Sequence, residues 1–454
     1  MKRILIKLLF CCTLLIVASC KNEATISGTA DKIKELGLYT FNKGEMVLVQ
    51  SVPVDPQDGT YSFIANLPYE GLYLFGRNQG ALYPLFLEGG DEITADFSNY
   101  DMYLSGQDLS YENKTLLEWE NGVNDVKVDA FMGKSLPGAS TSDYDIFFSK
   151  FDAACKLQQT LLDQIKEKKG EVLDFLRFKM ETDLAFYAIS FLKDNGYGIP
   201  QDYTLPSYYS NMEPDRIFQN PKILDIPYSG NMLEAYVWFV NKEKAVDKWN
   251  MDYHIESLND KALQQEYLLS VTSGMRYYDE YQNMLDQVGD DFFDEAYTNR
   301  LTEVEKRLLW SKPGLPAPDF KAMAPDSSWM NLSDYRGKVA VVDVWATWCE
   351  PCRRMMPLFH ELQKEFVGKN VVFLSVCVGV WIESEKWLQL SKEFHISENN
   401  FFVAGWNSDF VKEYRISGVP RYMIIDENGN IVSVNAPNPT TSKLKDMILK
   451  CLEK

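Results

Sequence analysis

The spacing of apolar and polar residues changes twice along the chain. Residues 24–104 hold short alternating runs separated by turn-forming residues, which predicts a small antiparallel β-sandwich-like domain. From about residue 110 to 310, apolar residues recur at helical spacing, which predicts a helical middle region. A linker with three prolines then leads into alternating apolar and amphipathic runs, which predict an α/β domain. The expected segments are a leader at 1–19, a β-rich domain at 20–108, the helical region at 109–311 and the α/β domain at 312–454.

The α/β segment begins with a run that is typical of a buried parallel strand. Residues 339–345 are apolar except for Asp343, and an amphipathic stretch to about residue 366 predicts a helix directly after them. These and the later runs predict a mixed sheet with helices on both faces. The later elements are expected to be a strand at 371–378, helices at 384–394 and 408–414, strands at 421–426 and 431–434 around a turn at 427–430, and a helix from 441.

The first twenty residues have the pattern of an export signal. Three basic residues precede an apolar run at 8–17, which is too short to remain as a membrane-spanning helix. Residues 17–20, Val-Ala-Ser-Cys, resemble the lipobox of exported bacterial lipoproteins. The resemblance implies that Cys20 is acylated and anchors the protein in the membrane, on the periplasmic side of the cell envelope. A soluble secreted protein with an incidental Cys20 is the alternative.

Charge and cysteine content narrow the possible partners. The formal charge is −19, and removal of residues 1–19, which hold three basic and no acidic residues, takes it to −22. This charge opposes binding to nucleic acid or anionic headgroups, so membrane attachment would rest on acyl chains. Of eight cysteines, the mature chain would keep one close pair and three singles, which is no disulfide scaffold. One single, Cys377, lies in an apolar run and is expected to be a packing residue.

The close pair, Cys349 and Cys352, lies between the predicted strand and helix. Two cysteines at this spacing can alternate between dithiol and disulfide. Cys349 would lie at the helix start, where unpaired backbone N–H groups favour a thiolate, so it is expected to be the attacking sulfur. Cys352, one turn further, would resolve the mixed disulfide and is expected to be the more buried of the two. A zinc site would need two more ligands, which His360 and His395 do not supply at a suitable spacing.

Three motifs resemble the TlpA/ResA-like branch of the thioredoxin superfamily. They are Trp-Ala-Thr-Trp-Cys-Glu-Pro-Cys at 345–352, Leu-Ser-Asp-Tyr-Arg-Gly-Lys at 332–338 and Gly-Val-Pro at 418–420. The resemblance implies a thioredoxin-like α/β fold and a thiol:disulfide oxidoreductase that reduces protein disulfides without an organic cofactor or metal. It further implies disulfide-bearing protein substrates, such as cytochrome c maturation targets, and a membrane-embedded electron donor of the thiol-relay type.

The same resemblance assigns roles to four other residues. Asp343 would be the buried acid that accepts the Cys352 proton through water, with a solvent-facing Asp at a strand edge as the alternative. Val419 and Pro420 would form the cis-proline loop that pairs with an extended substrate, and Trp348 would wall the thiol pocket. ResA-like proteins often carry a further glutamate where this chain has Met355, which leaves Asp343 as the sole candidate acid.

Two expectations concern the protein's activity. Glu350 places a negative charge beside the Cys349 thiolate, which disfavours the dithiolate and should make the couple reducing. A different class of function is also open, in which the first 310 residues form a binding or assembly module and the redox domain is accessory. The sequence does not identify the substrate or the membrane that holds the anchor.

Overall fold

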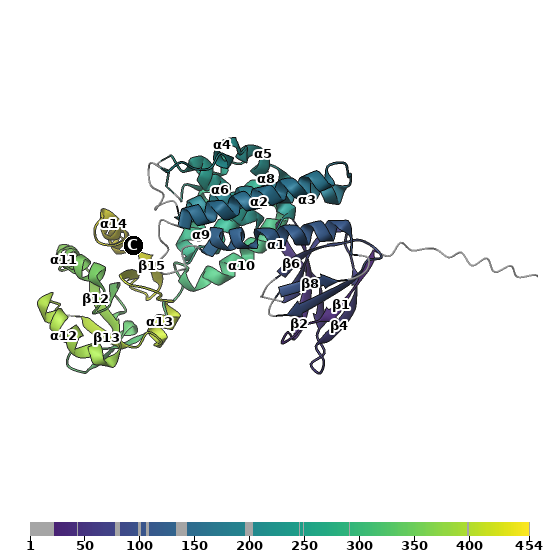
Figure 1. Ribbon diagram of the computed structural model, residues 1–454. Helices are drawn as coiled ribbons and strands as arrows, with labels where there is room; N and C mark the ends of the chain where they lie inside the picture. Colours follow the sequence, from purple (N-terminus) through teal and green to yellow (C-terminus); the bar gives the residue numbers. More distant parts are fainter. Residues whose placement is uncertain are drawn as a thin grey trace, which may run out of the picture. The chain divides into compact units, whose positions relative to one another are not determined.

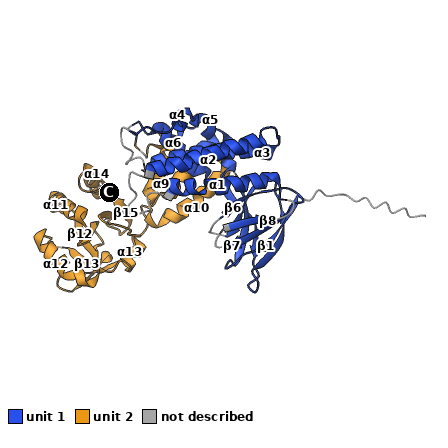
Figure 2. Ribbon diagram, in the orientation of Figure 1, with its two compact units in different colours: residues 1–246, 254–267 blue, residues 247–253, 268–454 orange. Residues whose placement is uncertain are grey.

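The structure is a computed structural model with two compact units (Figures 1 and 2). One unit comprises residues 1–246 and 254–267, and the other comprises 247–253 and 268–454. The leader and Cys20 lie outside the described residues, so those predictions and the predicted segment boundaries stay predictions. No helix within the described ranges is long and apolar enough to cross a membrane. The structure describes residues 22–453 except 43, 78–81, 99–100, 106–108, 133–142, 196–202, 245, 248, 290 and 397–398.

The β-rich part of the first unit consists of two four-stranded sheets, in the orders β4-β1-β7-β8 and β3-β2-β5-β6. Apolar side chains from both sheets, including Ile26, Leu38, Tyr73 and Phe75, form one buried core. The described strand pairs are antiparallel except β1 with β7, which is parallel. These two strands are far apart in sequence, so no hairpin turn constrains their direction. The strands are β1 (Glu23–Thr29), β2 (Glu35–Asn42), β3 (Glu45–Pro53), β4 (Thr60–Asn66), β5 (Gly71–Arg77), β6 (Leu82–Leu87), β7 (Glu92–Ser98) and β8 (Asp101–Ser105).

The middle region is helical, as its apolar spacing predicts. Within the first unit, α1 packs on α2 and α3, and residues 184–189 of α3 are buried all round. A helix that is apolar on every side lies inside a core. The helices of this region are α1 (Tyr111–Met132), α2 (Asp143–Ile165), α3 (Glu171–Asn195), α4 (Tyr208–Asn211), α5 (Pro214–Phe218), η3 (Pro221–Asp225), α6 (Ser229–Asn241), α7 (Met251–Ile255), α8 (Lys261–Ser273), α9 (Tyr278–Val288), α10 (Glu295–Leu308) and η4 (Leu309–Ser311).

The second unit is built on a seven-stranded mixed sheet with the order β10-β9-β13-β12-β11-β14-β15. One face packs Val339 and Val341 of β11 against α11 and α14, and the other face holds Val342 and Val344 in a second core. The elements are β9 (Lys321–Met323), β10 (Trp329–Asn331), η5 (Leu332–Tyr335), β11 (Val339–Trp345), α11 (Glu350–Glu365), β12 (Val371–Gly379), η6 (Trp381–Glu383), α12 (Ser384–Glu393), β13 (Asn400–Ala404), α13 (Asp409–Glu413), β14 (Arg421–Ile425), β15 (Ile431–Ala436) and α14 (Ser442–Leu452).

The strand β13 was not predicted from the sequence. It is five residues long and lies parallel to β12, between β12 and the short strand β9. Its sequence, Asn-Phe-Phe-Val-Ala, is too short and too uniformly apolar to give either a strand or a helix period. Its pairing with β12 therefore depends on tertiary structure.

Helical residues of the second unit pack directly on the redox sheet. Tyr277 and Trp310 lie against the core that contains Val342 and Val344. The guanidinium of Arg415 lies 5.0 Å from the Trp310 ring centroid. The sheet and the end of the helical region thus share one apolar core.

Candidate active site

The two cysteines lie where β11 ends and α11 begins. Cys349 is the N-cap residue of α11, and Pro351 occupies its first turn, where a missing N–H costs no hydrogen bond. Cys349 and Cys352 are joined by a disulfide with Cα atoms 5.3 Å apart. The backbone N–H of Cys352 donates to Cys349 Sγ at 3.1 Å. The helix therefore directs a backbone donor that has no partner within the helix at the sulfur that would carry the thiolate charge.

Both cysteines are equally buried, which corrects the expectation that Cys352 is the more buried. Each is 2% exposed in the oxidised structure. The disulfide belongs to an apolar cluster that includes Trp345, Met356 and Phe402, with Val419 packed against it. The side chain of Cys349 turns back toward the helix to bond Cys352, and these neighbours cover it.

The charged residues around the disulfide lie mostly in solvent. Glu350 and Arg354 form an ion pair at 3.7 Å, and both side chains are about two-thirds exposed, at 69% and 66%. Solvent screening weakens such a pair and its effect on the neighbouring sulfur. Arg353 differs, because its Nε atom is buried and has no hydrogen-bond partner among the described residues.

Asp343 lies inside the sheet and does not face solvent at an edge. It is 2% exposed, in a strand flanked by β12 and β14. Its Oδ1 atom has no hydrogen-bond partner within the described chain, and burial raises its pKa to about 7. A carboxyl group with this pKa can accept a proton from a thiol near neutral pH.

The strand places Asp343 under the helix that carries Cys352. Side chains alternate along β11, so Asp343 shares a face with Val341 and Trp345. Val341 belongs to the apolar cluster of Phe359 in α11, and Trp345 belongs to the cluster of the two cysteines. Asp343 lies between these two contacts.

Tyr422 is a residue of this region that the sequence reasoning missed. It lies opposite Asp343 in the β11–β14 register, and its hydroxyl is buried with no hydrogen-bond partner in the described part of the chain. Burial, and then the Asp343 carboxylate, raise the pKa of Tyr422. Met355 packs against the cluster that includes Tyr422, so an apolar side chain stands where the family resemblance led us to expect a glutamate. A tyrosine two residues after the Gly-Val-Pro motif, within an apolar run, was the signal available in the sequence.

The loop before β14 brings the third motif to the disulfide. The Val419–Pro420 peptide bond is cis, the form that the resemblance implies. Val419 packs against the disulfide cluster, and none of the described backbone hydrogen bonds uses its N–H or C=O. Trp348 is 56% exposed, and its ring centroid lies 5.9 Å from that of Trp406. The disulfide is thus flanked by an unpaired backbone segment and an exposed aromatic surface.

Arg421, directly after Pro420, was also missed. It is 4% exposed, and its guanidinium donates to the carbonyl oxygens of Val434 at 2.6 Å and Tyr414 at 3.1 Å. The same group lies 4.8 Å from the Tyr277 ring centroid. A buried guanidinium therefore ties the strand after the cis bond to the loop before it and to the helical region. An arginine at the start of an apolar strand was the only sequence signal.

Comparison with known proteins agrees with this geometry. A model of the redoxin family matches residues 312–448. The chain is 32% identical over 139 residues to the thiol-disulfide oxidoreductase ResA of Geobacillus kaustophilus, covering 30% of this chain and 75% of that protein. It is 27% identical over 142 residues to ResA of Bacillus subtilis, covering 29% and 72%. The solved thioredoxin domain of a Bacteroides vulgatus thiol-disulfide oxidoreductase is 23% identical over 31% of this chain and 98% of that one, with a TM-score of 0.28.

Through residues 312–448, the chain belongs to the redoxin family, as a TlpA/ResA-like thiol-disulfide oxidoreductase. The predicted thioredoxin-like domain and its class of chemistry are thereby confirmed. These matches cover only the C-terminal third and leave the β-rich domain and most of the helical region outside the comparison.

Asp343→Asn should stabilise the second unit at about pH 8 and have little effect at about pH 4. The Asp343 pKa is about 7 in the fold against an ordinary value of 3.8, so the unfolded chain ionises first and stability falls as the pH rises between these values. The difference between the two pKa values corresponds to about 4 kcal/mol of unfolding free energy at most. Hydrogen exchange of the β11 amides at both pH values measures the change in stability. Asp446→Asn, on the exposed face of α14, is the control. Equal protection of parent and variant at both pH values would contradict the assignment.

Proposed function

We propose that this protein reduces disulfides in other proteins from the periplasmic side of the cell envelope, where a lipid on Cys20 anchors it. The observation that carries the redox part is the Cys349–Cys352 bond at the N-terminus of α11, beside the unpaired Val419 backbone. An extended substrate segment can pair with that backbone and so bring its own disulfide to Cys349.

The reaction consists of two thiol–disulfide exchanges. The Cys349 thiolate attacks one substrate sulfur, which forms a mixed disulfide and releases the other substrate sulfur as a thiolate. Cys352 then gives its proton to Asp343 and attacks Cys349 Sγ, which re-forms the internal disulfide and releases the first substrate sulfur. The substrate gains two electrons, and the chain ends in the oxidised state that the structure holds. A membrane-embedded dithiol donor restores the two cysteines.

The surface beside the disulfide favours a polypeptide substrate. Val380, Trp381 and Ile382 are 50%, 56% and 88% exposed. Thr347 Oγ1, next to Trp348, donates to Glu383 Oε1 at 2.9 Å, which holds this turn close to the active-site loop. Contiguous exposed apolar residues at a redox site suit an apolar segment that flanks the substrate cystine. Proteins that acquire metal or haem groups after export, such as cytochrome c, are the substrates that the family resemblance suggests.

The proposed direction can be tested with trapped substrates and with the redox potential. Cys352→Ser should accumulate mixed disulfides through Cys349, because the resolving sulfur is gone. Cys349→Ser should trap nothing, and Cys155→Ser in α2 should behave like the parent chain. Non-reducing gels of envelope extracts measure the adducts. A potential close to the roughly −120 mV of strong periplasmic oxidants would contradict the reductase assignment.

Replacing Trp381 and Ile382 together by serine should lower kcat/KM for a cystine peptide with apolar flanks about tenfold, because about 1.4 kcal/mol of docking energy is lost. Reduction of 2-hydroxyethyl disulfide, which is too small to reach the turn, should be unchanged. Val367→Ser is the matched control, since Val367 is 81% exposed just beyond the opposite end of α11. A parallel loss on both substrates would mean that the turn acts only through the fold.

The lipid anchor can be tested through Cys20. Cells given labelled palmitate should label the parent chain and Cys155→Ala, whereas Cys20→Ala should carry no label and leave the membrane fraction. This prediction rests on the Val-Ala-Ser-Cys sequence at residues 17–20, where the short apolar run ends. An unlabelled parent chain that fractionates with soluble proteins would refute the anchor.

A further inference from the structure

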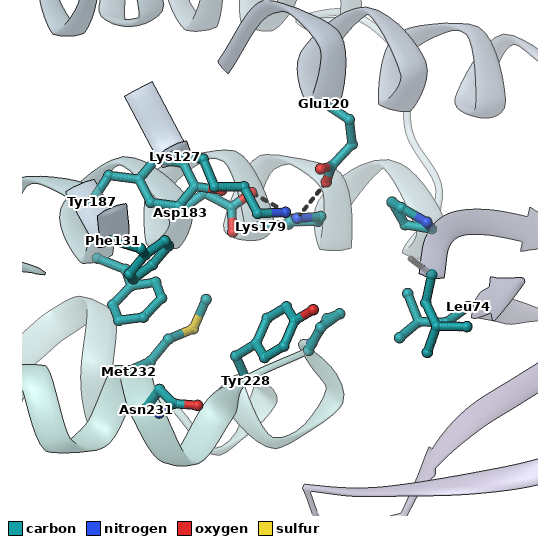
Figure 3. Close-up of a pocket in the computed structure, with 14 residues that line it drawn as sticks. Leu74, Glu120, Lys127, Phe131, Lys179, Asp183, Tyr187, Tyr228, Asn231 and Met232 are labelled. Carbon is teal, nitrogen blue, oxygen red and sulfur yellow. Dashed lines mark hydrogen bonds and ion pairs between the residues drawn. The ribbon is translucent and has the colours of Figure 1, made fainter. Parts of the chain in front are cut away.

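The first compact unit contains a pocket of about 350 Å³ at the junction of its second β-sheet with the helices (Figure 3). Residues from β5, β6, α1, α3 and α6 line it, so five elements converge on one space. A pocket of this size, apolar on most sides with a few convergent polar groups, is typical of a small-molecule site. The apolar lining includes Leu74, Leu82, Phe131, Phe186, Tyr228 and Met232.

A buried ion cluster forms one side of the pocket. Lys179, whose side chain is 5% exposed, pairs with Glu120 Oε1 at 2.9 Å and with Asp183 Oδ2 at 2.6 Å. Asp183 Oδ2 also accepts from Trp119 Nε1 at 2.9 Å. An ammonium group has three donors, and two of those of Lys179 have partners among the described residues. Buried ion clusters are costly to desolvate and contribute little net stability, and groups of this kind concentrate at functional sites.

The remaining cation at the pocket is Lys127 of α1. It lines the pocket and forms no ion pair within 4.0 Å among the described residues. Its positive charge nevertheless acts on the Glu120 carboxylate of the cluster. Burial acts to raise the pKa of Glu120, but Lys179 and Lys127 outweigh that effect and lower it. Because Lys179 engages both carboxylates, Lys127 is the one charged side chain of the lining without an ion-pair partner among the described residues, although the four formal charges sum to zero.

Aromatic and apolar side chains lie across from the cluster. In Figure 3, Tyr228 and Met232 face the charged groups from the opposite side, and Leu74 closes one end. Tyr228 has φ 66° and ψ 25°, a left-handed backbone conformation that residues other than glycine rarely adopt. This strained backbone holds a 61% exposed ring at the pocket, and such strain concentrates at ligand sites.

We propose that this pocket binds a small amphipathic carboxylate, with its anionic group at Lys127 and Lys179 and its apolar body among Phe131, Tyr228 and Met232. Two ammonium groups offer charge-assisted hydrogen bonds to the carboxylate, and the apolar lining removes the remainder of the ligand from water. The proposal is independent of the disulfide chemistry.

Calorimetric titration of the full-length chain with decanoate tests the proposal. Decanoate should bind saturably, and Lys127→Met should weaken its binding at least about tenfold through loss of the charge-assisted contact. Lys114→Met is the matched control, because Lys114 is an exposed lysine of the same helix that does not line the pocket. Met232→Trp, which fills the pocket, should abolish binding. Decyltrimethylammonium, which carries the opposite charge on a similar chain, should bind at least about tenfold more weakly.

Three results would overturn the proposal. They are no saturable heat with decanoate up to about 1 mM, equal affinity of the Lys127→Met, Lys114→Met and parent chains, and equal binding of the cationic probe. Circular dichroism establishes that Lys127→Met is folded, and its disulfide-reductase rate should equal that of the parent. If the parent chain proved to have no reductase activity, its binding of decanoate would be unaffected. The two proposals can therefore fail separately.

Discussion

The redox site depends on the junction between β11 and α11. All seven residues of β11 are buried, and the strand is bonded on both sides, so its end is fixed in space. The helix begins with Cys349 as its N-cap, which places the sulfur 3.1 Å from the Cys352 backbone N–H, a donor that favours negative charge. The disulfide, the acid beneath it and the loop of Val419 are all positioned relative to this junction. A shift of one residue in the strand would move Asp343 to the other face of the sheet.

The unsatisfied carboxyl of Asp343 is the energetic cost of this arrangement. An ionised carboxylate without partners is disfavoured in an apolar interior, and the raised pKa is the expression of that penalty. Met355 stands where the family resemblance suggests a second acid, while Tyr422 brings a second polar group without a hydrogen-bond partner among the described residues to the same region. In the proposed mechanism, proton transfer from Cys352 therefore rests on a single carboxyl group. Buried polar groups without partners often mark functional sites, where their cost is retained for chemistry.

Local patterns in the sequence predicted much of the redox domain. The predicted bounds of β11, β12, α12 and β14 lie within one residue of those observed, because an uninterrupted apolar run or a helical period is a local property. The strand β13, the parallel pairing of β1 with β7, and the contacts of Tyr422 and Arg421 depend on residues that only the fold brings together. The equal burial of Cys349 and Cys352 has the same origin, since neighbours from other strands and loops cover the disulfide. The pocket of the first unit left no motif, because its lining comes from five elements.

The central claim is that the fold holds the Cys349 sulfur where its thiolate is stabilised. The most direct measurement is the rate of alkylation of Cys349 by iodoacetamide in the reduced chain as a function of pH, with peptide mapping to assign the modified sulfur. The account predicts a midpoint below about 8.5, the value for a free thiol, and modification of Cys349 before Cys352. A midpoint at or above that value, or preferential modification of Cys352, would contradict it.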